Sequence, residues 1–156
     1  MKEKLEKAVK RACKNLYRRD KSLLNRNVNE RAILFRFGIY LQRIMSRDCK
    51  LKFYDLDNEY NRNIYEIKRT ENYPNGRYPD FIIHKRERND ANLLIIEFKK
   101  ENTDSEDDLK KIDDFLSFNS EYKYRFGMYI VLRENYVSYK IKECGKEYED
   151  KEIKIY

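Results

Sequence analysis

The sequence predicts an α/β (α+β) fold in which helices flank a mixed central sheet. One observation behind this class is a set of apolar residues that recur at helical spacing near the start of the chain: Leu5, Val9, Ala12 and Leu16. The other is a series of apolar or alternating runs after residue 50, interrupted by one further helical pattern. Extended runs around a helix are typical of a layered domain with a shared core.

The first predicted helix covers residues 3–19 and the second runs from about Asn29 to Ser46. Asn is a favoured N-cap, and Val28 is placed to pack against Ile33 across that cap. The apolar face of the second helix is formed by Leu34, Phe37, Leu41 and Ile44.

Strands are predicted at residues 51–56, 64–69, 78–85, 92–99, 126–132 and 137–141, with a short terminal strand near Ile153 and Ile155. Residues 73–76 are typical of a turn, and the charged residues 86–91 predict a hairpin loop. The continuous apolar run at residues 93–96 predicts a central strand covered on both faces. Ser105 followed by Asp108 predicts a capping box that opens a third helix.

Size and composition indicate one domain over residues 1–156, with a net charge of +7 that suits a phosphate-rich partner. The three cysteines are far apart, which disfavours a structural zinc site and fits a reducing, cytoplasmic setting. The start of the chain lacks the apolar region of a signal peptide, and no run is long enough for a membrane span. The four glycines are not at nucleotide-loop spacing, which disfavours an ATP- or NAD-dependent enzyme.

The segment with the clearest chemistry is Pro79-Asp80 followed by Glu97-Phe98-Lys99. Glu97 and Lys99 point the same way along a strand, and the predicted hairpin brings Asp80 beside them. Two desolvated carboxylates repel each other unless a cation lies between them. Mg²⁺ prefers oxygen ligands, and Asp80, Glu97 and the backbone carbonyl of Phe98 would supply them. Lys99 would orient the attacking water or stabilise developing negative charge.

These residues resemble the motif of the PD-(D/E)XK, or restriction-endonuclease-like, nuclease superfamily. The resemblance implies an αβββαβ core over about residues 29–132, with an extra N-terminal helix outside it. It also implies hydrolysis of phosphodiester bonds with Mg²⁺ or Mn²⁺, with DNA expected before RNA. The family often carries a further Glu on the helix before the sheet, and Glu30 matches that position. An apparent insertion at residues 64–76 and the lack of a separate sequence-reading domain depart from the pattern.

Each candidate residue also has a plainer explanation. Asp80 fits a turn residue after Pro79, and Glu97 and Lys99 fit a solvated strand end. Glu30 fits an acid in the first helical turn, where the macrodipole favours it by about 0.3–1 kcal/mol.

The residues around the motif are weaker candidates. Arg62, Arg77 and Lys100 are candidates for phosphate contacts. The acids Asp57 and Glu59 are expected at a solvated strand edge, Asp107 and Asp108 as first-turn helix acids, and the single histidine, His84, at the surface.

Three functions remain open on the sequence, the last of them a basic interaction module in which Glu97-Phe98-Lys99 is an accidental match. The first is a metal-dependent nuclease, acting alone, as a homodimer or within a larger repair, recombination or defence complex. The alternative is an inactive nuclease-like domain that binds nucleic acid or a protein partner.

Overall fold

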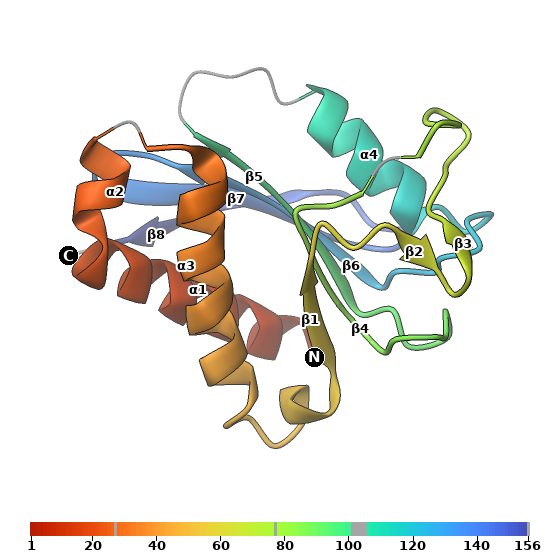
Figure 1. The fold of residues 1–156 in the computed structure, drawn as a ribbon, viewed down its shortest axis with the longest axis horizontal. Coiled ribbons are helices and arrows are strands. Elements are labelled where there is room, and N and C mark those ends of the chain that lie inside the picture. Colours follow the sequence, from red (N-terminus) through yellow and green to blue (C-terminus); the bar gives the residue numbers. More distant parts are fainter. Residues whose placement is uncertain (27, 77, 101–105, 156) are drawn as a thin grey trace.

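A six-stranded mixed sheet forms the centre of the structure, a computed structural model that describes residues 1–26, 28–76, 78–100 and 106–155 (Figure 1). The strand order is β1-β4-β5-β6-β7-β8, with β5 and β6 parallel and the other described neighbours antiparallel. The strands of this sheet are β1 (Asp55–Asn58), β4 (Phe81–His84), β5 (Leu94–Lys100), β6 (Phe126–Leu132), β7 (Tyr136–Glu143) and β8 (Glu149–Lys154). The helices are α1 (Lys2–Arg19), α2 (Lys21–Asn25), α3 (Glu30–Met45) and α4 (Glu106–Leu116).

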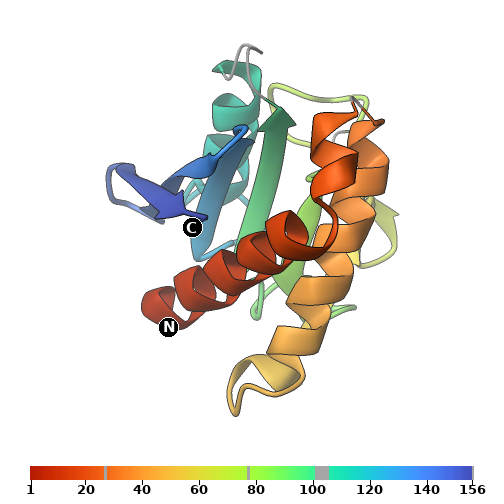
Figure 2. The ribbon, with the colours of Figure 1, turned by 90° about the vertical axis from the view of Figure 1, so that its left-hand side faces the viewer.

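Helices cover both faces of the sheet, as the sequence predicts: α1 and α3 lie on one side and α4 on the other (Figure 2). The alternation of side chains along β5 shows how the strand serves both layers. Leu94, Ile96 and Phe98 pack in the core under α1 and α3. Ile95 packs in the second core with α4, and Glu97 and Lys99 share its face. The chain is therefore a mixed α+β structure with a mixed central sheet.

The predicted hairpin is confirmed by the antiparallel pairing of β4 with β5, in which Phe81 lies opposite Ile96. One residue further along, the same register sets Asp80 opposite Glu97. The strand β5 lies inside the sheet, and its residues 94–98 are buried, which confirms a central strand. Asn29 is the predicted N-cap of α3, and its side chain accepts a hydrogen bond from the Arg31 amide.

The predicted strand at residues 51–56 is wrong over its first half. Residues Leu51–Phe53 form a 3-10 helix, η1, and the strand β1 begins only at Asp55. Asp48 explains the difference, because its Oδ1 accepts hydrogen bonds from the amides of Lys50 and Leu51 and so turns the chain. The short helix α2 was not predicted, and Ser105 of the predicted capping box lies outside the described residues.

The apparent insertion forms a separate two-stranded ribbon of β2 (Arg62–Asn63) and β3 (Glu66–Ile67) outside the central sheet. Lys68, only 1% exposed, fixes the segment to the α4 side of the molecule. Its ammonium lies 5.3, 5.4 and 5.6 Å from the ring centroids of Tyr60, Tyr122 and Tyr124. The insertion is thus docked through a buried cation held by aromatic rings.

Membrane insertion by a helix has no support in this structure. No helix in the described part of the chain combines the length and the apolar character needed to cross a bilayer.

Candidate active site

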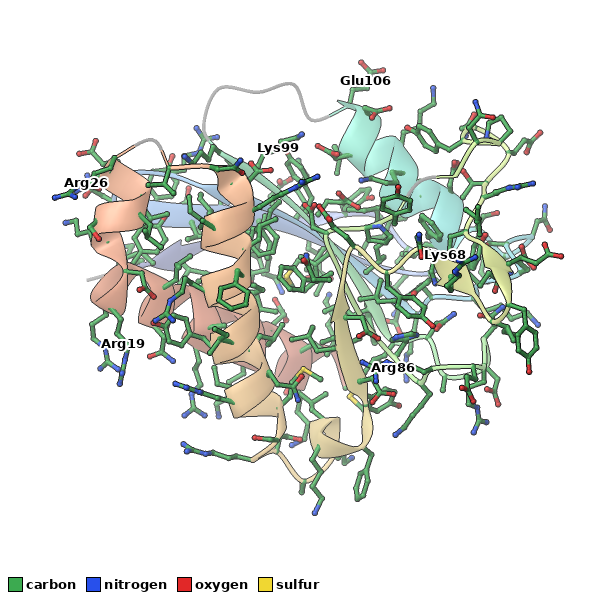
Figure 3. All side chains as sticks on the ribbon, viewed as in Figure 1. Arg19, Arg26, Lys68, Arg86, Lys99 and Glu106 are labelled. Atoms are coloured by element: carbon green, nitrogen blue, oxygen red, sulfur yellow. The ribbon has the colours of Figure 1, made fainter. Side chains whose placement is uncertain are left out.

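The predicted motif residues meet where the chain enters β4, beside the part of β5 that extends beyond the β4 pairing. The Asp80 carboxylate accepts a hydrogen bond of 2.8 Å from the Phe98 amide, which ties the two segments together. Glu97 is 1% exposed, and Lys99 is half-buried on the same face of β5. Figure 3 shows Lys99 between the N-terminal ends of α3 and α4. The structure therefore brings Asp80, Glu97 and Lys99 together as predicted.

The helix α4 adds two charged residues that the sequence reasoning missed. Lys111 donates a hydrogen bond of 2.6 Å to Glu97 Oε2, and Asp108 Oδ2 lies 3.2 Å from the Lys99 ammonium. Asp108 lies in the first turn of α4, as predicted, but it and Lys111 are each only 5% exposed and face the sheet. Both lie on the buried stripe of α4, with Asp108 one turn before Ile112 and Lys111 one turn before Phe115. In the sequence, only these apolar neighbours indicate the stripe.

We call these residues the carboxylate–lysine cluster: Glu30, Asp80, Glu97, Lys99, Asp108 and Lys111. Burial is the largest influence on the pKa of two of its acids, Glu97 and Asp80. It raises the pKa of Glu97 well above the usual 4.5, more than the Lys111 cation lowers it, and nearby Asp80 raises it further. Burial also raises the pKa of Asp80, opposed by the hydrogen bond from the Phe98 amide. The site thus favours any ligand that returns positive charge to these oxygens.

Lys99 responds in the opposite sense. Partial burial works to lower the pKa of its ammonium, but the pKa is raised overall by nearby carboxylates, of which Asp108 has the largest effect. Glu30 and Asp80 act in the same direction as Asp108. Lys99 is therefore held as a cation at the edge of the cluster.

Glu30 lies in the first turn of α3, half-buried, and its charge also raises the pKa of Asp80. Lys100 donates a 2.7 Å hydrogen bond to the Val28 carbonyl, which ties the end of β5 to the chain just before α3. Of the other predicted phosphate contacts, Arg62 is exposed on the separate ribbon, and Arg77 lies outside the described residues.

Comparisons with known proteins give no relative. No protein-family model, curated protein or solved structure matches the chain. The site is therefore interpreted from its own residues.

A metal would find few preformed ligands here. Within the described ranges, no group of three or more His, Cys, Asp or Glu side chains is arranged to hold an ion. One atom nevertheless fits a cation: Glu97 Oε1 is buried and has no hydrogen-bond partner among the described residues. Burying such an oxygen without a positive partner is costly. Asp80, on the neighbouring segment, would supply a second oxygen ligand for the same cation.

A second polar cluster lies further along β4 and corrects two expectations. His84 is 3% exposed rather than at the surface, and its Nε2 lies 2.8 Å from Asp57 Oδ2. Arg86 Nε and Nη2 also donate hydrogen bonds to the two oxygens of Asp57, so Asp57 is not a solvated edge residue. Burial works to raise the pKa of Asp57, but hydrogen bonds from His84 and Arg86 lower it below its usual 3.8. These contacts join β1 to β4 and stabilise the edge of the sheet.

Proposed function

We propose that this chain is a metal-dependent nuclease of the PD-(D/E)XK type that hydrolyses phosphodiester bonds in nucleic acid, with DNA as the expected substrate. The observation that carries the proposal is the buried, unpartnered oxygen of Glu97, facing α4 beside Asp80 and Lys99. The succession α3, β1, β4, β5, α4 and β6 supports it, since it follows the αβββαβ order that the motif implies.

In this proposal Asp80, Glu97 and the backbone carbonyl of Phe98 hold Mg²⁺ or Mn²⁺. A bound ion of this kind supplies a Lewis acid and lowers the pKa of its water. Lys99, kept positive by Asp108, stabilises negative charge on the phosphate or orients the attacking water. Glu30, at the N-terminal end of α3, adds negative charge that favours the cation.

Lys111 takes part in the same scheme. In the described structure its ammonium bonds Glu97 Oε2 and lies 3.8 Å from Asp108 Oδ1. Lys111 therefore supplies positive charge to Glu97, and Asp108 offers it a second partner if Glu97 turns to a metal. Asp108 and Lys111 are positioning residues in this proposal, because they act through Glu97 and Lys99.

A second candidate function is an inactive nuclease-like domain that binds nucleic acid or a protein partner. The Lys111–Glu97 ion pair favours it, because a permanent internal cation would satisfy the buried acid without metal. Under this alternative the cluster is a structural link between β5 and α4.

The deciding experiment measures cleavage of single-stranded and duplex DNA and RNA with Mg²⁺, Mn²⁺ or EDTA. Wild type, Lys99→Ala and the matched control Lys123→Ala are compared; Lys123 is exposed and lies away from the cluster. We expect cleavage only with metal and a loss of roughly 10²-fold or more in Lys99→Ala alone, as for removal of one charge-stabilising donor.

Calorimetric titration of Mn²⁺ into wild type and Glu97→Gln separates the two candidates. Metal binding that Glu97→Gln abolishes supports the nuclease. Failure of wild type both to bind Mn²⁺ and to cut any substrate would leave the binding domain as the better explanation.

A further inference from the structure

A groove between α1 and α3 carries positive charge that the carboxylate–lysine cluster does not use. Two adjoining hollows form this groove, and Arg11, Ile44 and Arg47 line both of them. We call it the α1–α3 basic groove, and its cations are Lys4, Lys7, Arg11, Arg19, Arg43 and Arg47. The acids that line it are Glu3 and Asp48.

The cations of this groove are mostly unpaired. Lys4 is bound to Asp48 at 3.0 Å. In the part of the chain that the structure describes, the side chains of the other five groove cations form no ion pair or hydrogen bond. Elsewhere cations such as Arg86, Lys140 and Lys151 are paired with carboxylates. Unpaired like charges on facing helices repel each other, so this groove favours an anionic ligand.

The chemistry of the groove favours phosphate over a lipid surface. Arginine supplies four of its cations, and the planar guanidinium binds phosphate with two parallel hydrogen bonds. Membrane-surface helices place large apolar side chains beside their cations. None of the large apolar side chains exposed in the described chain, such as Phe35 and Phe53, lines this groove.

We propose that the α1–α3 basic groove binds the phosphate backbone of nucleic acid at a distance from the cleavage site, an inference that rests on the proposed nuclease function. The helix α3 links the two places, with Glu30 at its start beside the cluster and Arg43 in its last turn at the groove. Thirteen residues of helix span roughly 20 Å. At 3.4 Å per base pair this corresponds to about six base pairs.

The test measures binding of a fluorescent DNA duplex of about 24 base pairs, several times longer than the span. EDTA is present, so that metal-dependent cleavage is absent. The groove variant is Arg11→Gln/Arg47→Gln, and the matched control is Lys123→Gln/Lys154→Gln. The control removes the same charge from exposed residues that line neither hollow.

We expect the groove variant to bind the duplex roughly tenfold more weakly at low salt and the control to stay near wild type. The slope of log Kd against log salt concentration should be smaller by about 2 in the groove variant, a decrease of about one for each phosphate contact removed. Equal weakening in both variants would overturn the proposal, because net charge alone would then explain binding. Displacement of the duplex by polyglutamate at equal charge concentration would also overturn it, in favour of an acidic protein partner.

Cleavage assays on the same variants keep this proposal separate from the nuclease function. Groove-dependent binding by a protein that cuts nothing would retain the groove and reject the nuclease. Metal-dependent cutting with unchanged binding in the groove variant would retain the nuclease and reject the groove.

Discussion

Glu97 and Lys111 are both buried and form an ion pair with each other. Their exposed fractions are 1% and 5%, and the contact between them is 2.6 Å long. A buried ion pair adds little net stability relative to an apolar pair, yet the loss of one partner leaves a costly buried charge.

We predict that Lys111→Met lowers the free energy of unfolding by about 3–5 kcal/mol, because Glu97 then lacks its cation. Urea denaturation measures this loss, with the exposed neighbour Lys110→Met as the control. The double variant Glu97→Gln/Lys111→Met should recover much of the stability. A double variant as unstable as the single one would show that Lys111 acts by packing alone.

Lys68 is a second residue whose charge is destabilised by burial in the folded state. Burial lowers the pKa of its ammonium from 10.5 to about 8, although Asp57 and Glu121 act to raise it. A folded-state pKa below the unfolded one means that the unfolded chain binds more protons between these two values. The contribution of Lys68 to the free energy of unfolding of the wild type therefore rises as pH increases from about 8 to 10.5.

We predict that Lys68→Met is more stable than wild type at neutral pH and that this advantage shrinks as pH rises from about 8. The advantage is at most about 3 kcal/mol, and the three tyrosine rings reduce it by stabilising the cation. Denaturation at several pH values measures it against Lys110→Met. An advantage that stays constant over this pH range would mean that folding does not lower the pKa of Lys68.

At the scale of elements, α4 positions two residues of the cluster and depends on a close approach to β6. Gly127 in β6 makes this approach possible, because a methyl group added there would collide with Ile112 and approach Leu116. The helix can thus present Asp108 and Lys111 to β5 only while residue 127 has no side chain.

We predict that Gly127→Ala destabilises the fold by about 1–3 kcal/mol, as for overpacking of a well-packed core, and moves α4 away from the sheet. The displacement should weaken Mn²⁺ binding more than a surface change of similar kind, such as Lys123→Ala. Calorimetry and thermal unfolding measure the two effects. Unchanged metal affinity in a destabilised Gly127→Ala would show that the position of α4 does not affect the site.

Patterns within one element could be predicted from the sequence, whereas contacts between distant elements could not. The cap at Asn29 and the buried run of β5 are local, and both are confirmed. Leu51 and Phe53 alternate like a strand, but the side chain of Asp48 holds them in a 3-10 turn. Periodicity does not report such a side-chain contact.

The same limit applies to the candidate site. The proximity of Asp80 to Glu97 follows from one hairpin and could be predicted. The pairing of Glu97 with Lys111 depends on how α4 packs across the sheet. Lys111 lies on the buried stripe of α4, but a charged residue is not expected there from an apolar pattern. The burial of His84 likewise depends on Asp57 in a strand 27 residues earlier.

For the molecule as a whole, the fold protects the three cysteines to different degrees from reagents in the solvent. Cys13 of α1 is fully buried, and burial raises the pKa of its thiol to about 12. Cys49 is exposed, and the half-buried Cys144 thiol donates a hydrogen bond to the Leu116 carbonyl.

We predict that a Cys49→Ser/Cys144→Ser variant reacts with a thiol reagent only as fast as it unfolds, because Cys13 is both buried and protonated. The labelling rate at rising urea concentration measures this, with fully unfolded protein as the control. Rapid labelling in the native state would contradict the tight packing of α1 against the sheet.

The helix α1 begins at residue 2, yet two of its charged residues have partners in β7 and β8. Lys2 is paired with Glu149, and Glu6 is bound by Tyr139 and Lys151. During synthesis on a ribosome, nearly the whole described chain must therefore be made before Glu6, the buried acid of α1, can bind Lys151. The residues of the carboxylate–lysine cluster on β5 and α4 emerge earlier, so a nascent chain carries them before the opposite layer has been completed.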